Sequence, residues 1–358
     1  CDGQLPQASD PQLVERAKTA KDKLIGKALV LGHHYQRNEV IDFADITGDS
    51  FKLAQAAAEQ SSIENIIFAG VHFMAESADI LTKDSQKVIL PDLAAGCSMA
   101  DMATANQVND CWNYLEKLGV AKQTVPITYM NSSAAIKAFT GKNGGTVCTS
   151  SNAPRAMQWA FEKREKVLFL PDQHLGRNTA VLKLGLSLTD CVVWNPWQPA
   201  GGLSDEQIRQ AKVILWRGHC SVHGRFSLNN ITEVRSRLAG VKVLVHPECQ
   251  HEVVKNADVV GSTEMIIKTV TDSAAGSIWA IGTELNLVQR LAQNNLDKQI
   301  VFLDKTVCYC STMNRIDLPH LVWAMESLVR GEVVNQIKVD SETKQFAKTA
   351  LDQMLALP

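Results

Sequence analysis

Long apolar runs, basic runs and a dense array of cysteines are all missing from this sequence. No segment approaches about 18 uninterrupted apolar residues, the length that predicts a membrane-spanning helix. The net charge is −2, so nothing in the composition favours binding to nucleic acid. The nine cysteines are odd in number and not densely spaced, which in a chain of 358 residues favours reduced thiols and a cytoplasmic protein.

An initiator Met is missing as well, and the sequence starts at Cys1. A mature bacterial lipoprotein begins with a cysteine, and that interpretation would place the chain outside the cytoplasm. The other interpretation is that the numbering starts inside a longer chain. We favour the second, because several unpaired thiols in apolar surroundings suit a reducing compartment.

What the sequence does contain is a regular alternation of apolar runs and helical segments. Hydrophobic residues make up 45% of the chain, and its 358 residues are long for a single core, which indicates two or three domains. The run at 28–32 is continuously apolar, which is typical of a strand buried on both faces, and the runs at 66–70, 241–245 and 278–282 are also read as strands. Strands that alternate with helices in this way predict right-handed βαβ units and parallel sheets.

Three of the apolar runs are each followed by a cysteine a few residues later. The runs and their cysteines are 88–90 with Cys97, 212–215 with Cys220, and 300–303 with Cys310. Because ligands of open α/β sheets bind at the carboxyl ends of the strands, these positions predict three thiolates at one point. Three thiolate ligands leave one corner of a four-iron cluster open.

The spacing of residues repeats along the chain, which indicates duplication. The matched pairs are His33–Cys97 and His246–Cys310 at 64 positions, and His33–Ser50 and His246–Thr263 at 17 positions. We therefore predict an α/β fold of three small three-layer αβα domains with parallel sheets. The domains are expected to be related by pseudo-three-fold symmetry, with the active site at their common centre. Their predicted boundaries are 1–97 plus 311–358, 98–220, and 221–310.

Short motifs between the first apolar run and the last cysteine carry a family resemblance. They are Gly32-His33-His34-Tyr35-Gln36, Gly48-Asp49-Ser50, Gly70-Val71-His72-Phe73-Met74-Ala75-Glu76, Thr128-Tyr129-Met130-Asn131-Ser132-Ser133-Ala134, Leu175-Gly176-Arg177, Cys220-Ser221-Val222-His223, His246-Pro247-Glu248 and Gly261-Ser262-Thr263. Together they resemble quinolinate synthase, the iron–sulfur enzyme of NAD biosynthesis, over nearly the whole chain. The family's three-domain fold agrees with the repeat. The long insertion before Trp216 and the Cys308-Tyr309-Cys310 pair depart from the family's most compact members.

The resemblance implies an activity, substrates and a cofactor. Iminoaspartate would condense with dihydroxyacetone phosphate to give quinolinate, phosphate and water, on a [4Fe–4S] cluster whose open iron is a Lewis acid. No nucleic acid or membrane is implied as a partner. Iminoaspartate is unstable in water, so transient contact with L-aspartate oxidase is a delivery route to consider, although no motif here supports it.

Two other functions stay open from the sequence. One is a different [4Fe–4S]-dependent hydroxy-acid dehydratase, which product identification would distinguish. The other is a two-lobed periplasmic binding protein with Cys1 as its lipid anchor. A brown protein that absorbs broadly near about 400 nm, as iron–sulfur thiolate clusters do, would exclude the binding protein.

The cysteines divide into predicted ligands and predicted core residues. Repeat position and resemblance assign Cys97, Cys220 and Cys310 to the cluster, and Cys308 breaks the 64-residue register. The cysteines expected to be ordinary core residues are Cys111, Cys148, Cys191 and Cys249. A structural zinc site is the alternative for the ligands, with His223 as a fourth donor, and the resemblance argues against it.

Three hydroxyl residues stand where a strand or turn meets a predicted helix: Ser50, Ser150 and Thr263. Helix starts offer free backbone N–H groups and a dipole that favours anions, and the implied substrates carry carboxylates and a phosphate. We therefore predict that the three bind substrate. The alternative is that they are ordinary N-cap residues.

Polar residues at strand ends supply the predicted acid–base groups. The condensation moves protons at several steps, so donors and acceptors of near-neutral pKa are useful. Glu248 is assigned as general acid or base, His246 as a substrate-orienting group and Tyr35 as a proton-transfer group in ring closure; His33 completes the catalytic set. The predicted substrate-binding residues are His33, Ser50, Tyr129, Asn131, Ser150, His223, His246, Glu248 and Thr263. No role is predicted for His34, His219 or His251.

Overall fold

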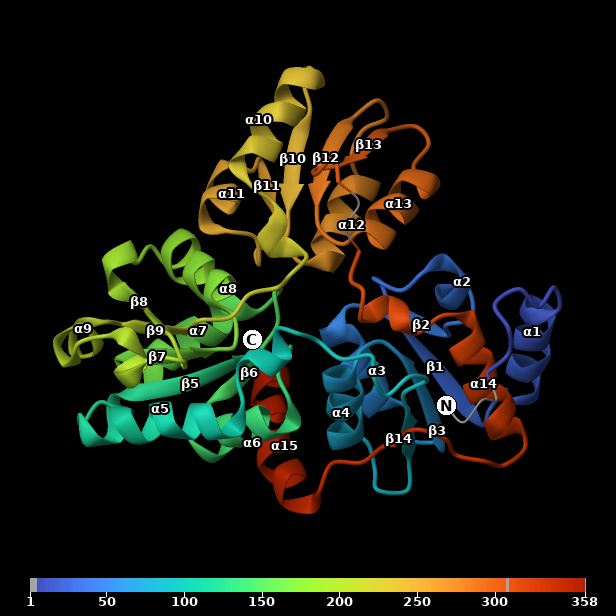
Figure 1. Ribbon diagram of the computed structural model, residues 1–358, viewed down its shortest axis with the longest axis horizontal. Coiled ribbons are helices and arrows are strands. Elements are labelled where there is room, and N and C mark those ends of the chain that lie inside the picture. Colours follow the sequence, from blue (N-terminus) through green and yellow to red (C-terminus); the bar gives the residue numbers. More distant parts are fainter. Residues whose placement is uncertain (1–4, 307–308, 358) are drawn as a thin grey trace. The chain divides into compact units, whose positions relative to one another are not determined.

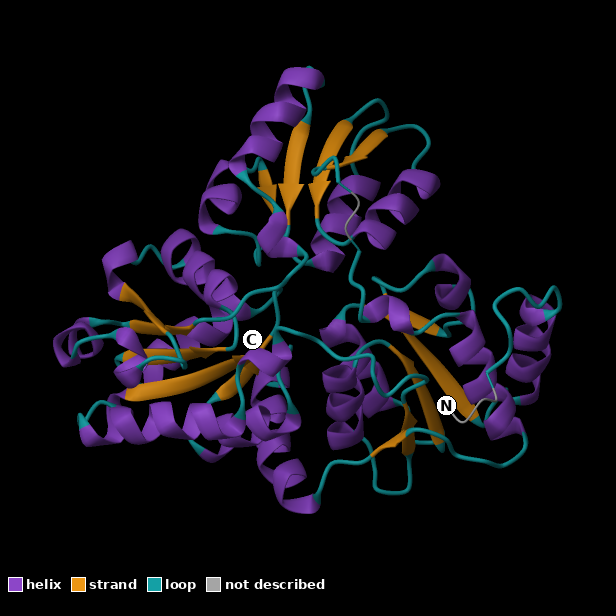
Figure 2. Cartoon of the chain, in the orientation of Figure 1, coloured by secondary structure: helices purple, strands orange, loops and turns teal. Residues whose placement is uncertain are grey.

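The protein, seen here as a computed structural model that describes residues 5–306 and 309–357, contains three β-sheets in which parallel pairing dominates. Figure 1 labels the elements, and Figure 2 shows each sheet lying between helices. The predicted α/β fold class with parallel sheets is therefore confirmed. Cys1 and Cys308 lie outside the described residues.

The first sheet has the strand order β14-β4-β3-β1-β2, and only β14 runs antiparallel to its neighbour. Its strands are β1 (Ala28–His33), β2 (Ile46–Gly48), β3 (Asn65–Ala69), β4 (Lys87–Ile89) and β14 (Gln336–Ile337). The helices that accompany it in the chain are α1 (Leu13–Lys23), α2 (Asn38–Ile41), α3 (Ser50–Glu59), α4 (His72–Leu81) and α14 (Leu318–Val329). Every residue of β3 is buried, as expected for a central strand covered on both faces.

The second sheet has the order β6-β5-β7-β9-β8 and is entirely parallel. Its strands are β5 (Thr124–Tyr129), β6 (Thr146–Cys148), β7 (Lys166–Leu170), β8 (Cys191–Trp194) and β9 (Val213–Trp216). Its helices are α5 (Ala105–Lys117), α6 (Ala134–Lys142), α7 (Ala153–Lys163), α8 (Gln173–Asn178) and α9 (Asp205–Gln210), and α8 continues into a π-helical turn over Thr179–Lys183. Trp216, Leu168 and Ile136 are fully buried in its core.

The third sheet has the order β11-β10-β12-β13 and is also parallel throughout. Its strands are β10 (Lys242–Val245), β11 (Val259–Val260), β12 (Ile278–Gly282) and β13 (Gln299–Phe302). Its helices are α10 (Leu228–Arg237), α11 (His251–Asn256), α12 (Thr263–Thr271) and α13 (Leu285–Asn294). Phe226, Val243 and Ala280 belong to the core on this sheet.

All three sheets share one strand pattern. When the strands are numbered within each repeat, their order across the sheet is 2-1-3-4. The second strand thus lies on one side of the first, and the third and fourth lie on the other side. β8 is an addition to the second sheet beyond its fourth strand, β9, and it comes from the insertion that stretches the middle repeat. The duplication predicted from the spacing of residues thus recurs in the hydrogen-bonded order of the strands.

The chain separates into two compact units rather than three. The first unit comprises 1–97, 284–290 and 308–340, and the second comprises 98–283, 291–307 and 341–358. The second unit therefore contains both the second and the third sheets. The predicted three-fold symmetry and common centre stay predictions.

The two last helices divide between the units, whereas the prediction assigned all of 311–358 to the first domain. In the first unit α14 packs on α1, where the Arg16 guanidinium donates to both carboxylate oxygens of Glu326 at 2.8 and 2.7 Å. In the second unit α15 (Ser341–Leu355) packs on α6 and β6 (Figure 1). Gly141 makes this approach feasible, because a Cβ there would lie 2.0 Å from the carbonyl oxygen of Phe346.

No helix among the described residues is both long and apolar enough to cross a membrane.

Candidate active site

Two histidines and a glutamate meet in the second unit, at the carboxyl end of the third sheet. His223 opens a short 3-10 turn (His223–Arg225), while His246 and Glu248 directly follow β10. His223 Nδ1 lies 2.9 Å from Glu248 Oε2, and its Nε2 lies 3.1 Å from the Thr283 hydroxyl. The rings of His223 and His246 stack with centroids 4.4 Å apart. Each of these three predicted site residues is 2% exposed, so the group is shielded from bulk water.

The protonation of this group follows from its burial and its hydrogen bonds. Burial, reinforced by the neighbouring His223, lowers the pKa of His246 to about 3. Burial alone raises the pKa of Glu248, but His223, His246 and hydrogen bonds from His223 and Tyr129 reverse this and lower it to about 2. His246 Nδ1 accepts the Glu248 backbone N–H at 3.4 Å, so the 3.9 Å approach of His246 to the Glu248 carboxylate is not an ion pair. Near pH 7 Glu248 is ionised and His246 is neutral.

His33 and Tyr35, two further predicted catalytic residues, lie together in the first unit. His33 is the last residue of β1, and its Nδ1 accepts the Tyr35 backbone N–H at 3.1 Å. Their rings make an edge-to-face contact with centroids 4.7 Å apart. His33 is 4% exposed and Tyr35 is half-buried.

The three predicted anion-binding hydroxyl residues are not the caps of their helices. α3 begins at Ser50, but its cap is Asp49, whose side chain accepts the N–H groups of Phe51 and Lys52. α12 begins at Thr263, but its cap is Ser262. Ser150 lies in the turn before α7, two residues ahead of the N-cap position. The N-cap alternative from the sequence is therefore wrong for all three.

A cavity of about 590 Å³ in the second unit joins the second and third repeats. Its lining includes Ser150 from the turn after β6, Ser262 at the start of α12 and Pro247 from the loop that carries Glu248. Among the described residues that line it, Lys183 and Lys255 carry charge and none is a carboxylate. The cavity thus offers hydroxyl groups and positive charge, which suits an anionic small molecule.

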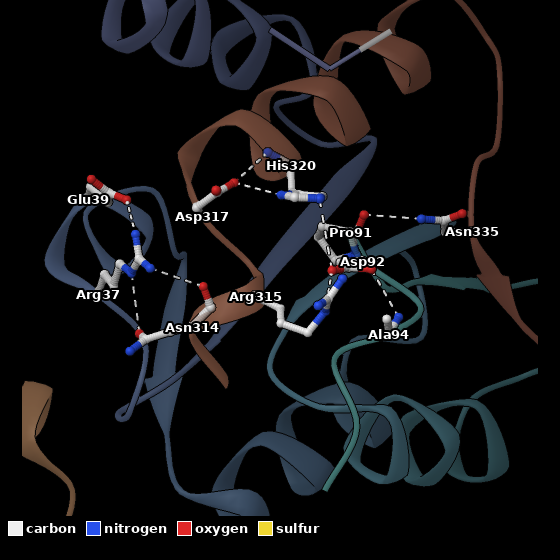
Figure 3. A network of polar contacts seen from close by, with 10 residues as sticks. All are labelled: Arg37, Glu39, Pro91, Asp92, Ala94, Asn314, Arg315, Asp317, His320 and Asn335. Carbon is white, nitrogen blue, oxygen red and sulfur yellow. Dashed lines mark hydrogen bonds and ion pairs between the residues drawn. The ribbon is translucent and has the colours of Figure 1, made fainter. Parts of the chain in front are cut away.

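A polar network in the first unit ties together the segments that carry the other two predicted ligand cysteines (Figure 3). Asp92 lies between β4 and Cys97, and its Oδ1 accepts the Ala94 backbone N–H at 2.9 Å. The Oδ2 of Asp92 accepts Arg315 Nε at 2.8 Å, and Arg315 follows Cys310 in the chain. The segment that precedes Cys97 and the segment that follows Cys310 are therefore held together by one ion pair.

Comparison with known proteins decides the family. The family model described as quinolinate synthetase A protein matches residues 15–356. A quinolinate synthase of Streptomyces coelicolor is 69% identical over 360 residues, which cover 100% of this chain and 91% of that protein. Quinolinate synthases of a Nocardioides species and of Acidobacterium capsulatum are 67% and 55% identical, over 100% and 97% of this chain and 92% and 94% of theirs.

The chain belongs to the quinolinate synthetase A family. The predicted resemblance is confirmed over the length on which it was based, and the chain is therefore a member of a family of enzymes. The roles predicted for individual residues stay predictions, and the geometry above shows which of them share a unit.

The donor set of this quinolinate synthetase A family member fits a metal centre with cysteine ligands. Cys97, Cys220 and Cys310 each follow the fourth strand of a repeat and are each half-buried. Cys111, Cys148 and Cys249 are fully buried, whereas the three predicted ligands are half-buried. Burial raises the thiol pKa of Cys310 as well as that of the three fully buried cysteines, so exposure rather than pKa separates the two groups. Cys191 is half-buried as well, but it begins β8 rather than following a fourth strand.

Cys220 also belongs to a second candidate donor set. Its Sγ and the ligand atoms of His223 and Glu248 all lie within 4.8 Å of one another. Sulfur, nitrogen and oxygen donors of this kind suit zinc, the alternative that the sequence left open. The same geometry places the predicted cluster ligand Cys220 beside the predicted acid–base residue Glu248 and the predicted substrate-binding residue His223.

Two buried carboxylates, each beside a predicted site residue of its own unit, were given no role from the sequence. Asp172, which caps α8, is fully buried; burial and then the charge of Glu248 raise its pKa well above the usual value, and its Oδ2 has no hydrogen-bond partner among the described residues. Burial raises the pKa of Glu284 to about 7, although the backbone N–H groups of Cys310, Leu287 and Asn286 donate to it. Each follows the third strand of its repeat, and that position is the signal that could have found them.

Proposed function

We propose that this chain is a quinolinate synthase that condenses iminoaspartate with dihydroxyacetone phosphate to give quinolinate, phosphate and two waters. The observation that carries the proposal is the position of Cys220, whose sulfur lies within 4.8 Å of His223 and Glu248. A cluster ligand beside a buried acid–base pair is what a cluster-dependent dehydration needs. The proposed substrates are those that the resemblance implies, and membership of the quinolinate synthetase A family supports them.

The proposed cofactor is a [4Fe–4S] cluster held by Cys97, Cys220 and Cys310. Three half-buried thiols at equivalent repeat positions match the three-cysteine ligand set. When bound, such a cluster supplies an open iron that acts as a Lewis acid on a substrate oxygen. The chain's own side chains carry the rest of the proposed chemistry.

Proton transfer is the proposed work of Glu248 and Tyr35. Glu248 is ionised and buried, so its carboxylate takes a proton from substrate, and His223, hydrogen-bonded to it at 2.9 Å, holds it in place. His246 is neutral and presents a ring nitrogen that orients a substrate oxygen. Tyr35 moves a proton during ring closure. His33, Tyr129 and Asn131 bind and orient the substrates.

Anion recognition is the proposed work of Ser50, Ser150 and Thr263. None of the three caps a helix, so their hydroxyls are not committed to that task. The substrates carry carboxylates and a phosphate, and helix starts stabilise such groups through N–H donors and the helix dipole. Delivery of iminoaspartate by transient contact with L-aspartate oxidase is part of the proposal.

The proposed function is tested on anaerobically prepared full-length protein. Iron and acid-labile sulfide are measured first, and the protein is then supplied with dihydroxyacetone phosphate and freshly generated iminoaspartate. We expect four irons per chain and quinolinate identified by mass spectrometry. Zinc in place of iron would contradict the cofactor, and a product other than quinolinate would favour a different dehydratase.

Replacing Ser50 or Thr263 by Ala is expected to raise the Michaelis constants more than it lowers stability. Neither residue caps a helix, so the usual penalty of about 1 kcal/mol for a lost cap should not appear. Thermal unfolding and initial rates measure the two effects.

Thr104 supplies the matched control, because it caps α5 through a capping box and belongs to no predicted site. Thr104→Ala should lower the melting temperature and leave the Michaelis constants unchanged. If Ser50→Ala and Thr263→Ala behave like this control, the two hydroxyls are structural.

A further inference from the structure

The loops that follow the first strand of each repeat are equivalent by sheet register. The first and third strands pair through Gly32 and Ala69, through Thr128 and Leu170, and through Val245 and Gly282. The residues that come next, which we term the strand-end residues, are His33, Tyr129 and His246. All three are predicted site residues.

Predicted site residues recur at one further position of these loops. The second residue after the strand-end residue is Tyr35 in the first repeat, Asn131 in the second and Glu248 in the third. In the first and third repeats the two residues are in contact, because His33 Nδ1 accepts the Tyr35 backbone N–H and His246 Nδ1 accepts the Glu248 backbone N–H. Each loop therefore offers two functional side chains at alternate positions.

In all three repeats a polar side chain donates hydrogen bonds to two backbone carbonyl oxygens of the loop. One belongs to the residue between the two functional side chains and the other to the residue after them. Arg290 donates to the carbonyl oxygens of His34 and Gln36 at 2.9 and 2.6 Å. Asn178 donates to those of Pro247 and Cys249, each at 2.9 Å. Lys137 donates to those of Met130, at 2.8 Å, and Ser132. In each repeat the accepting groups are the first and third residues after the strand-end residue.

The donors of two loops also occupy equivalent positions. Asn178 stands eight positions after Leu170, the end of β7, and Arg290 stands eight positions after Gly282, the end of β12. Each holds the loop of another repeat within its own unit. In the first repeat that position is Ser77, whose hydroxyl donates to Phe73 in its own helix. The second loop is instead held by Lys137 from its own repeat.

Neighbouring groups fix two of these donors. His251 Nδ1 lies 2.9 Å from the Asn178 Oδ1, so this ring donates to the amide oxygen and turns the amide NH₂ toward the two carbonyl groups. Arg290 Nε donates to Asn38 Oδ1 at 2.8 Å. Asn178 is 3% exposed and Lys137 is fully buried, so water does not replace them.

We propose that Lys137, Asn178 and Arg290 are positioning residues, which lock the three strand-end loops so that their alternate side chains face the substrates. The proposal rests on the proposed function, because it takes the loop side chains to act on substrate. Each donor holds two carbonyl oxygens at once, so its loss frees both ends of the turn. A displacement of about 1 Å in a reacting group can cost on the order of a hundredfold in rate.

The chain offers a matched pair of buried lysines for the test. Lys137 lies in α6 and holds carbonyl groups just past the carboxyl end of β5, whereas Lys166 starts β7 and donates to the carbonyl oxygens of Arg209 and Ala211 at 2.6 and 2.5 Å. Both are buried and both hold two backbone carbonyl groups. Lys137→Met and Lys166→Met therefore remove the same kind of contact at opposite ends of the strands of one sheet.

The experiment compares the two variants as cluster-loaded full-length enzyme, with rates normalised to iron content. Lys137→Met is expected to lose on the order of tenfold or more in kcat, whereas Lys166→Met keeps kcat within about twofold at a similar loss of melting temperature. Hydrogen exchange should speed up at amides 131–133 in Lys137→Met only. Equal kcat in the two variants would overturn the proposal.

Two further results separate this proposal from the proposed function. If the wild-type enzyme makes no quinolinate, the function is wrong, and exchange at 131–133 still decides whether Lys137 holds the loop; unchanged exchange there overturns the proposal. If Lys137→Met does not fold, Asn178→Ala is compared with Asn295→Ala. Asn295 donates to the Leu291 carbonyl oxygen at 2.8 Å, four residues earlier in the chain. It therefore holds a backbone carbonyl group outside the strand-end loops. Only Asn178→Ala should lose kcat, and equal losses would overturn the proposal.

Discussion

Replacing Cys220 by Ser is expected to remove the metal centre and the activity together, while the chain stays folded. A serine hydroxyl is a poor substitute for a thiolate ligand of iron, and Cys220 is half-buried in a loop rather than packed in a core. The same loss is expected for Cys97→Ser and Cys310→Ser. Iron and sulfide content, absorption near about 400 nm and quinolinate formation measure the loss, and circular dichroism reports the fold.

Cys191→Ser is the matched control for these substitutions. Cys191 is half-buried like the three predicted ligands, and burial raises the pKa of its thiol to about 11, but it starts β8 and follows no fourth strand. Full iron content and activity are expected in this variant. Any of Cys97, Cys220 and Cys310 whose substitution behaves like Cys191→Ser is not a ligand.

Cys308 and Cys310 present two thiols for one ligand position, and the register of the repeat chooses between them. Cys310 stands 64 positions after His246, as Cys97 stands 64 after His33. Cys308 lies outside the described residues, so the choice rests on the sequence, by register and by the resemblance that assigned Cys310. Cys308→Ser should keep a four-iron cluster and most activity under anaerobic conditions, whereas Cys310→Ser should lose both. The reverse result would mean that register selected the wrong cysteine.

The fold was predictable because buried parallel strands leave a strong pattern. Runs such as 28–32 and 66–70 are apolar on both faces, and their alternation with helices allows few topologies. The equal spacing of His33–Cys97 and His246–Cys310 predicted the duplication that the strand orders display. The position of α15 was not predictable in this way, since it depends on the close approach permitted by Gly141 on α6.

The candidate site was predictable only where a functional residue ends a strand. His246 and Glu248 follow β10 and could be singled out for that reason, and the structure adds their contact with His223. Asn178 and Lys137 lie within or at the end of helices, where a lone polar residue gives no signal. Their importance depends on carbonyl groups far along the chain or around a turn, which sequence pattern does not reveal.

Glu248→Gln is expected to keep the cluster and to lower turnover by on the order of a hundredfold or more, the range for losing a general acid or base. In the wild-type protein His223 Nδ1 lies 2.9 Å from the Glu248 carboxylate. The amide oxygen of Gln can still accept this hydrogen bond, so the geometry of the site should persist. What is lost is the negative charge and the basic oxygen. Iron content, melting temperature and kcat under saturating substrates distinguish these effects.

The control for this substitution is Glu252→Gln, which makes the same chemical change on an exposed residue of α11, four positions further along the chain. It should leave kcat, iron content and melting temperature unchanged. Glu248 is buried between His223, His246 and Tyr129, so an effect of its charge on chemistry should appear in kcat with only a small change in the Michaelis constants. Wild-type turnover in Glu248→Gln would remove Glu248 from the proton-transfer role and leave it as the residue that orients His223.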